Sequence, residues 1–162
     1  MQTTVKLIAV LAAFAAAPAH AEGDAAAGEK AFSQCQTCHV VVNDAGETLA
    51  GRKAKTGPNL YGVVGRTAGS LEGFKGYGKS LQEAGAAGLV WDEEKFVAYV
   101  QDPTAFLKEQ TGDSKARGKM AYKVKKAEDA ANLYAFLSTF SPAPADAAPA
   151  DGAAAEPAAP TN

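Results

Sequence analysis

Two cysteines, one histidine and one methionine remain to do chemistry in this chain once its first 21 residues are set aside as a leader. Three of these four residues stand together in Cys35-Gln36-Thr37-Cys38-His39. Cys-x-x-Cys-His is the attachment signature of a c-type haem. The spacing predicts thioether bonds from Cys35 and Cys38 to one haem c per chain, with His39 as an axial ligand of the iron.

The single remaining thioether lies far downstream, at Met120. A methionine on the second axial face would complete a His/Met ligand pair, which raises the reduction potential of the iron. After the leader is removed, the chain holds no other imidazole or thioether. His39 and Met120 together predict a haem with both axial positions filled, which favours electron transfer.

The cysteines, the histidine and the methionine could also serve other kinds of site. Cys35 and Cys38 could form a thioredoxin-like redox pair, but the adjacent His39 favours haem. A structural zinc ion takes about four ligands, and no second cysteine or histidine pair exists. A haem peroxidase or gas-binding protein needs an open sixth position, so Met120 would then be only a core side chain. A purely structural or assembly role would leave the full ligand set unexplained.

Residues 1–21 have the parts of a secretory signal peptide. A short basic start precedes an uncharged apolar run over residues 7–17, and Ala19-His20-Ala21 supplies a small-x-small cleavage site. The run is about half the length that spans a bilayer. We expect export and cleavage after Ala21.

The composition changes again near residue 141. Residues 141–162 are almost entirely Ala and Pro with three acidic residues and no aromatic or branched aliphatic side chain. Such a segment buries too little apolar surface to offset its ordering entropy, which predicts a disordered acidic tail. One haem domain is therefore expected over residues 22–140.

Short helices and long Gly-rich loops are expected within that domain. Asp24 is a plausible N-cap for a helix over residues 25–32, and Asp92 for a helix over 93–101. A third helix is expected over 128–140, where apolar residues recur at helical spacing. No stretch alternates convincingly as a strand.

Several further stretches follow the haem motif in a fixed order. They are Lys55-Thr56-Gly57-Pro58-Asn59-Leu60-Tyr61-Gly62, Gly65-Arg66, Trp91, Tyr99, Gly118-Lys119-Met120 and Leu133-Tyr134-Ala135-Phe136-Leu137. With that order the chain resembles the class I c-type cytochromes, specifically the bacterial cytochrome c2 type, over about residues 23–140. The resemblance implies an all-α cytochrome c fold, with short helices and long loops wrapped around one covalently attached haem c.

The resemblance also assigns roles around the haem. Pro58 would accept a hydrogen bond from Nδ1–H of His39, fixing the imidazole tautomer. Leu60 would contact the haem, and Tyr99 would lie near the sulfur of Met120. The residues implied at the inner haem propionate are Arg66, Tyr77 and Trp91. Pro58 also suits a simple turn, and Trp91 and Tyr99 also suit ordinary positions in the core. Stretches longer than in the small mitochondrial members, at 41–52, 84–89 and 111–116, favour the long cytochrome c2 subtype.

Basic residues cluster at two places along the chain. The chain has 16 basic and 18 acidic residues, and residues 22–140 are formally neutral once the leader and the tail are set aside. Near the expected haem edge, however, cations predominate, at Lys53, Lys55, Lys115, Arg117, Lys119, Lys123, Lys125 and Lys126. We call these eight residues the basic collar. It predicts docking to acidic membrane complexes, and the alternative is an ordinary solvated face.

The resemblance implies a periplasmic one-electron carrier rather than an enzyme. The cytochrome bc1 complex would be the electron donor, and a photosynthetic reaction centre or a cytochrome oxidase the acceptor. We expect a monomer that does not span the membrane. Nucleic acid is not expected as a partner, because the chain is exported and acidic overall.

Overall fold

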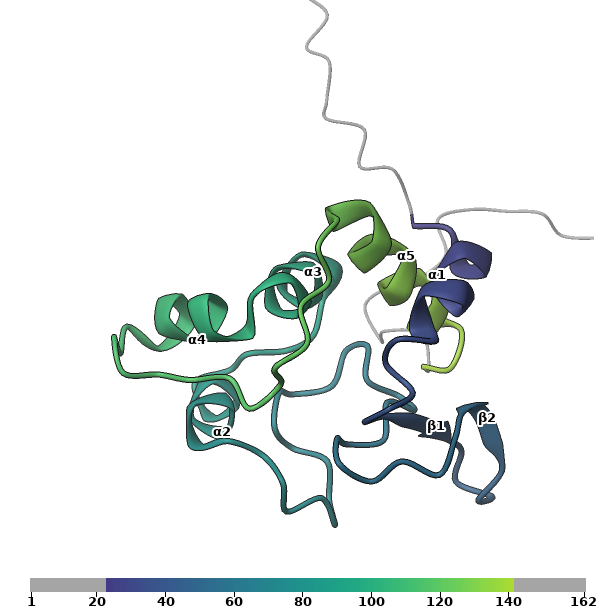
Figure 1. Ribbon diagram of the computed structural model, residues 1–162. Coiled ribbons are helices and arrows are strands. Elements are labelled where there is room, and N and C mark those ends of the chain that lie inside the picture. The colour runs from purple at the N-terminus through teal and green to yellow at the C-terminus, as the bar shows by residue number, and fades with distance from the viewer. Residues whose placement is uncertain (1–22, 142–162) are drawn as a thin grey trace, which may run out of the picture.

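The computed structural model of this chain describes residues 23–141 (Figure 1). The predicted leader and the predicted tail beyond Ser141 lie outside this range. In chain order the elements are α1 (Ala25–Phe32), β1 (Val40–Val42), β2 (Thr48–Gly51), α2 (Lys79–Ala86), α3 (Glu93–Gln101), α4 (Pro103–Thr111) and α5 (Ala127–Ser138). In Figure 1, α1 and α5 lie together on one side, α2 and α4 on the other, and α3 between them.

The helix pair α1–α5 joins the two ends of the described chain. Asp24 caps α1 by accepting hydrogen bonds from two N–H groups of its first turn, as predicted. A Cβ at Gly28 would lie 1.9 Å from the Asn132 carbonyl oxygen, so only glycine permits this close crossing. The Phe32 and Phe136 rings then meet at 5.4 Å between centroids. This crossing places the end of α1, and with it the haem motif, against the core.

Helices α3 and α4 form a corner at Asp102-Pro103. Asp92 caps α3 by accepting from the Lys95 N–H, and α3 ends at Gln101 as the sequence predicts. Helix α4 begins directly at Pro103. Proline suits the first helical position, because a backbone N–H there would have no partner within the helix. No helix was predicted over residues 103–111, because an Asp-Pro pair after residue 101 is also typical of a helix end.

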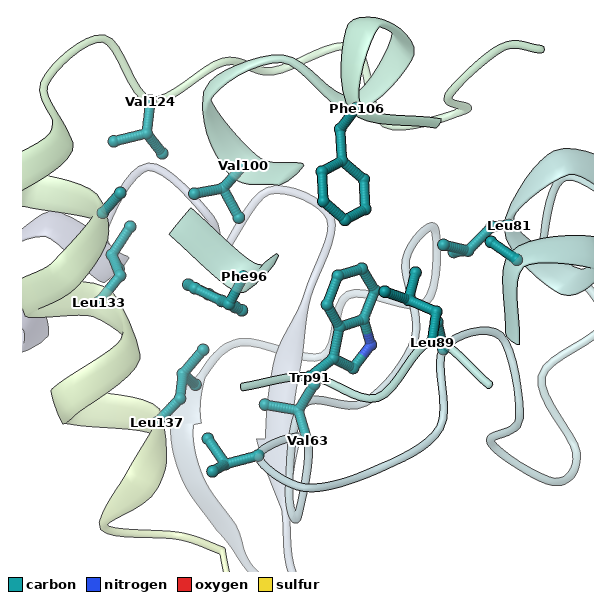
Figure 2. Close-up of a cluster of buried hydrophobic side chains, with 14 of the residues drawn as sticks. Val63, Leu81, Leu89, Trp91, Phe96, Val100, Phe106, Val124, Leu133 and Leu137 are labelled. Atoms are coloured by element: carbon teal, nitrogen blue, oxygen red, sulfur yellow. The ribbon is translucent and has the colours of Figure 1, made fainter. Parts of the chain in front are cut away.

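The buried core links α5, α3 and the corner. Figure 2 shows Leu133 and Leu137 of α5 facing Phe96 of α3, with Trp91 between Phe106 and Val63. These side chains are all less than a tenth exposed. Burial of this kind holds the short helices in place despite their length, because isolated helices so short are marginal in water.

The expectation that no strand occurs is wrong. Strands β1 and β2 pair antiparallel, with an irregular step in register between Val41 and Val42. Leu49, at this step, is 43% exposed, while Val41 is fully buried. The extended stretch after the haem motif is therefore a β-hairpin, closed by a turn in which Gly46 has a φ of 81°.

Helix α2 was also missed, and α5 is shorter than expected. The N-cap of α2 is Gly78, which has no side chain to signal a helix start. Helix α5 ends at Ser138 rather than residue 140, although Phe140 still packs on Phe136 with 5.0 Å between ring centroids. Within residues 23–141, no helix has the length and apolar character needed to cross a membrane.

Candidate haem site

The haem motif continues directly from the C-terminal end of α1. The Cys35 N–H donates to the Phe32 carbonyl (2.8 Å), and the N–H groups of Cys38 and His39 both donate to the Cys35 carbonyl (3.1 and 2.9 Å). These short-range bonds wind residues 35–39 into a turn that carries the imidazole beside both sulfurs. Cys35 and Cys38 form no disulfide, and both are half-buried.

The environment of Cys35 keeps its thiol protonated. Burial, and to a smaller extent the neighbouring Cys38, raise the pKa of Cys35 to about 11. A buried thiol that is not ionised is a poor metal or redox thiolate. This environment argues against the thioredoxin-like reading, in which a lowered cysteine pKa is the usual requirement.

The imidazole of His39 is oriented by the loop that follows the hairpin. Its Nδ1 lies 2.9 Å from the Pro58 carbonyl oxygen. Burial lowers the pKa of His39, only partly opposed by this hydrogen bond, which favours the neutral ring. With Nδ1 donating to Pro58, Nε2 carries the free lone pair, which is the form that binds a metal.

Gly57 lies flat against the same ring, a contact that the sequence analysis did not identify. A Cβ built on Gly57 would come within 2.4 Å of the His39 Cε1 atom. Its N–H also donates to the Cys38 carbonyl (2.7 Å). The Gly-Pro pair therefore fixes both the position and the tautomer of the imidazole, and a glycine directly before Pro58 was the available signal.

Asn59 fastens this loop to the hairpin and was likewise missed as a site residue. Its side-chain amide donates to the Val42 carbonyl (2.7 Å), while its Oδ1 accepts from the N–H groups of Val42 (2.9 Å) and Tyr61 (3.1 Å). The Leu60 N–H adds a bond to the Val40 carbonyl (2.9 Å). The hairpin thus supports the residues that hold His39.

The three residues predicted at the propionate lie close together. Backbone bonds join the Arg66 segment to Trp91: the Trp91 N–H donates to the Arg66 carbonyl (3.1 Å), and the Gly65 N–H donates to the Trp91 carbonyl (2.9 Å). The guanidinium of Arg66 donates to two loop carbonyls. Tyr77 is near enough for its phenol and the guanidinium to influence each other's pKa values, although burial is the larger cause for both.

Tyr99 packs in the same region. Its ring centroid is 4.9 Å from that of Trp91 and 5.7 Å from that of Phe106. Burial, with a smaller effect from Tyr77, raises the pKa of Tyr99 to about 12, so its hydroxyl stays protonated. Trp91 and Tyr99 are thus core side chains as well as candidate haem neighbours.

The described residues fit a c-type haem. Leu60, Tyr77, Tyr99 and Met120 each pack on the core while remaining partly exposed, so they offer a mostly apolar border to a flat ring. The donor set of two thiols, a neutral imidazole with a free Nε2 and a thioether is the set that haem c uses.

All eight residues of the basic collar are exposed. Lys53 and Arg52 line a hollow of about 490 Å³ together with Gln36 and Thr37 of the haem motif. One acidic residue, Asp102, also lies at the collar, where its Oδ2 accepts a hydrogen bond from Lys123 Nζ (2.7 Å). The residues next to Lys123 in the sequence do not indicate this contact.

A second hollow, of about 540 Å³, lies between α1 and residues 122–126 and adds Lys30 to this basic surface. Lys30 is a contribution that the linear pattern did not reveal.

Comparisons with known proteins agree with this geometry. The chain is 67% identical over 138 residues to a cytochrome c2 of Cereibacter sphaeroides, covering 85% of this chain and 95% of the relative. The crystal structure of cytochrome c2 from Rhodobacter sphaeroides matches with a TM-score of 0.73 and 68% identity, over 74% of this chain and 98% of that one. Ferric cytochrome c-550 from Paracoccus versutus matches with a TM-score of 0.69 and 47% identity, over 75% and 100%. No family model matches. The predicted fold class is confirmed by these neighbours.

Proposed function

This chain belongs to the bacterial cytochrome c2 family, and from that premise we propose that it carries single electrons through the periplasm. As a member of the family it is an electron carrier with covalently attached haem c. The proposed donor is the cytochrome bc1 complex, and the proposed acceptor is a photosynthetic reaction centre or a cytochrome oxidase. Its proposed state is a monomer without a membrane-spanning segment.

The observation that carries the proposal is the fixed imidazole. His39 presents Nε2 because the Pro58 carbonyl, at 2.9 Å, takes the proton-bearing Nδ1. Cys35 and Cys38 would bind the haem vinyl groups, and Met120 would be the second axial ligand. Bound haem c supplies an iron that takes up and releases one electron.

The chain's own residues would keep the structural rearrangement between the two oxidation states small. The hydrogen bond to Pro58 holds the imidazole in one orientation and strengthens it as a donor, so His39 need not rearrange between oxidation states. Met120 would exclude small ligands from the other face. The remaining N–H groups of the Arg66 guanidinium, together with Tyr77 and Trp91, would pair the inner propionate, because an unpaired buried carboxylate is costly.

An enzymatic role is not proposed. A haem enzyme needs an open iron position and an acid–base group beside it. After the predicted leader the chain has one histidine, His39, which this proposal uses as a ligand, and Met120 would fill the sixth position.

The basic collar is proposed as the docking surface. Complementary charge between it and an acidic membrane complex would raise the rate of encounter more than the affinity. Exposed charges are screened over about 10 Å at 0.1 M salt, so docking through the collar must weaken as salt rises.

Charge reversal tests the docking surface. Lys115→Glu with Lys125→Glu should slow reduction of the ferric protein by purified cytochrome bc1 complex about tenfold at low salt. Lys75→Glu with Lys108→Glu is the matched control, because both lysines are exposed, lie outside the collar and form no ion pair within residues 23–141. Lys123 is spared because of its bond to Asp102. Equal, salt-independent rates in all three proteins would show that the collar is an ordinary solvated face.

A further inference from the structure

The loop that carries Met120 is fastened to a corner of the fold that follows the haem motif by more than 60 residues in the sequence. This corner comprises residues 100–104, where α3 ends at Gln101 and α4 begins at Pro103. We infer that the corner positions Met120 by holding the loop on both sides of the methionine, with Thr104 and Asp102 as positioning residues. The inference rests on the proposed role of Met120 as an axial ligand.

The first contact lies two residues before the methionine. The Gly118 N–H donates to Thr104 Oγ1 at 3.1 Å. A Cβ on Gly118 would lie 2.6 Å from the Pro103 Cβ atom, so the loop backbone lies directly on the proline ring. Glycine at this position lets the N–H reach the threonine hydroxyl.

The second contact lies three and four residues after the methionine. Lys123 Nζ donates to Asp102 Oδ2 at 2.7 Å, and the Val124 N–H donates to the Val100 carbonyl at 2.9 Å. The hydrogen bond from Lys123 is the largest cause, and that from the Ala105 N–H the next, of a pKa of Asp102 below its ordinary value. The Asp102 carboxylate therefore both caps α4 and holds the loop that carries Met120.

Between the two contacts the loop has one further hydrogen bond, from Lys119 Nζ to the Gly76 carbonyl (3.2 Å). Residues 120–122 make no hydrogen bond to any other part of the described chain, residues 23–141. The Met120 side chain packs partly buried against the core. A segment with so few bonds opens more readily than its surroundings. The contacts at the corner therefore limit how far Met120 can move.

Asp92 provides an internal comparison for Asp102. It also caps a helix and pairs with a lysine, but that lysine is Lys95 of the same helix. Removing the charge at Asp92 should cost helix stability without freeing the methionine loop. The same change at Asp102 should do both, because its lysine belongs to the loop.

Three variants separate the contacts. Asp102→Asn keeps a good N-cap residue, but the amide nitrogen that replaces Oδ2 cannot accept from Lys123. Thr104→Val removes the acceptor of the Gly118 N–H at nearly constant volume, and Thr104→Ser restores it. Asp92→Asn is the control for charge and capping.

Imidazole binding to the ferric holoprotein measures release of the methionine, because an external ligand binds only the fraction in which Met120 has left the iron. Loss of the far-red sulfur-to-iron charge-transfer band follows the binding. Thr104→Val should raise the apparent imidazole affinity about fivefold, which corresponds to one lost hydrogen bond. Asp102→Asn should raise it about twofold at low salt, with the difference from the parent vanishing at high salt, because exposed pairs are weak and screened.

Thr104→Ser and Asp92→Asn should keep the parent's affinity, even if urea unfolding shows that Asp92→Asn lowers stability as much as Asp102→Asn. Parental affinities in both Thr104→Val and Asp102→Asn would overturn the inference while leaving the ligand assignment intact. An increase in Asp92→Asn equal to that in Asp102→Asn would also overturn it, because general destabilisation would then explain the effect. A parent protein without the charge-transfer band would overturn the role of Met120 first, and this inference with it.

Discussion

The histidine side and the methionine side of the site are built in different ways. His39 is held by residues 35–59, through a helical turn, the Pro58 carbonyl and the face of Gly57. Met120 lies in a long loop whose hydrogen bonds on either side of the methionine reach back to Gly76, Thr104 and Asp102, 43, 14 and 21 residues from their partners. Both sides depend on tertiary contacts, but the histidine side has many hydrogen bonds and the methionine side has few.

This difference assigns separate tasks to the two sides. A densely bonded imidazole cannot leave without disrupting the hairpin and the loop that hold it. A loop with few bonds can release its methionine while the rest of the fold persists, since such regions open at lower free-energy cost. Changes on the histidine side should therefore damage the holoprotein, and changes on the methionine side should alter its ligation and potential.

The largest effect is expected from removing the two cysteines that would attach the haem on the histidine side. Cys35→Ala with Cys38→Ala should abolish covalent haem and most of the folded protein, because a cofactor bound only by the native state contributes its binding energy to folding. Acid–acetone extraction and circular dichroism would measure both losses. Extraction of haem from the unmodified protein would show that the thioether assignment is wrong.

Replacing the methionine should leave the fold but change the iron. Met120→Ala should lower the reduction potential by on the order of 0.2 V, a quarter of the roughly 0.8 V that axial ligands span, because a thioether favours ferrous iron. Carbon monoxide should then bind the ferrous protein rapidly. Slow binding with the same fall in potential would indicate capture by a neighbour such as Lys119. An unchanged potential would contradict ligation by Met120.

A smaller perturbation of the histidine side is available at Gly57. Gly57→Ala forces a Cβ into the His39 ring, which must shift, at an expected cost of about 1–3 kcal/mol of unfolding free energy. Gly46→Ala is the control, since Gly46 has a positive φ but open space around it. Both should lower the urea midpoint, but only Gly57→Ala should shift the histidine resonances of the holoprotein. Equal spectra would contradict the contact.

The sequence predicts those parts of the fold that depend on neighbours along the chain. Helix α1 has its bounds as expected and α3 ends as expected, because Asp24 and Asp92 are N-caps beside apolar residues at helical spacing. The hairpin was missed because its first strand has only three residues and its stability comes from Asn59, 17 residues beyond Val42. A strand fixed by such a distant side chain leaves no periodic pattern.

The same division holds within the site. Cys35, Cys38 and His39 are recognisable from spacing alone, and Pro58 from the family resemblance. The supports of Met120 could not be predicted, because they depend on a corner formed by Asp102 and Pro103 that joins two helices. The roles of all these residues toward haem stay predictions.

The smallest effect concerns acid stability on the methionine side. Asp102 has a lowered pKa, chiefly through Lys123, so its pair stabilises the fold above the ordinary pKa of 3.8 and is lost as the pH falls through the still lower folded value. The gap in urea midpoint between the parent and Asp102→Asn should be present at neutral pH. It should close well below pH 3.8. A gap independent of pH would contradict the pair's contribution.

The ferric spectrum of the unmodified protein, read beside carbon monoxide binding to its ferrous form, tests most directly whether both axial positions are filled. The account predicts a weak far-red sulfur-to-iron charge-transfer band and slow carbon monoxide binding. Absence of the band together with rapid binding would contradict it, because the sixth position would then be open and Met120 would be only a side chain of the core.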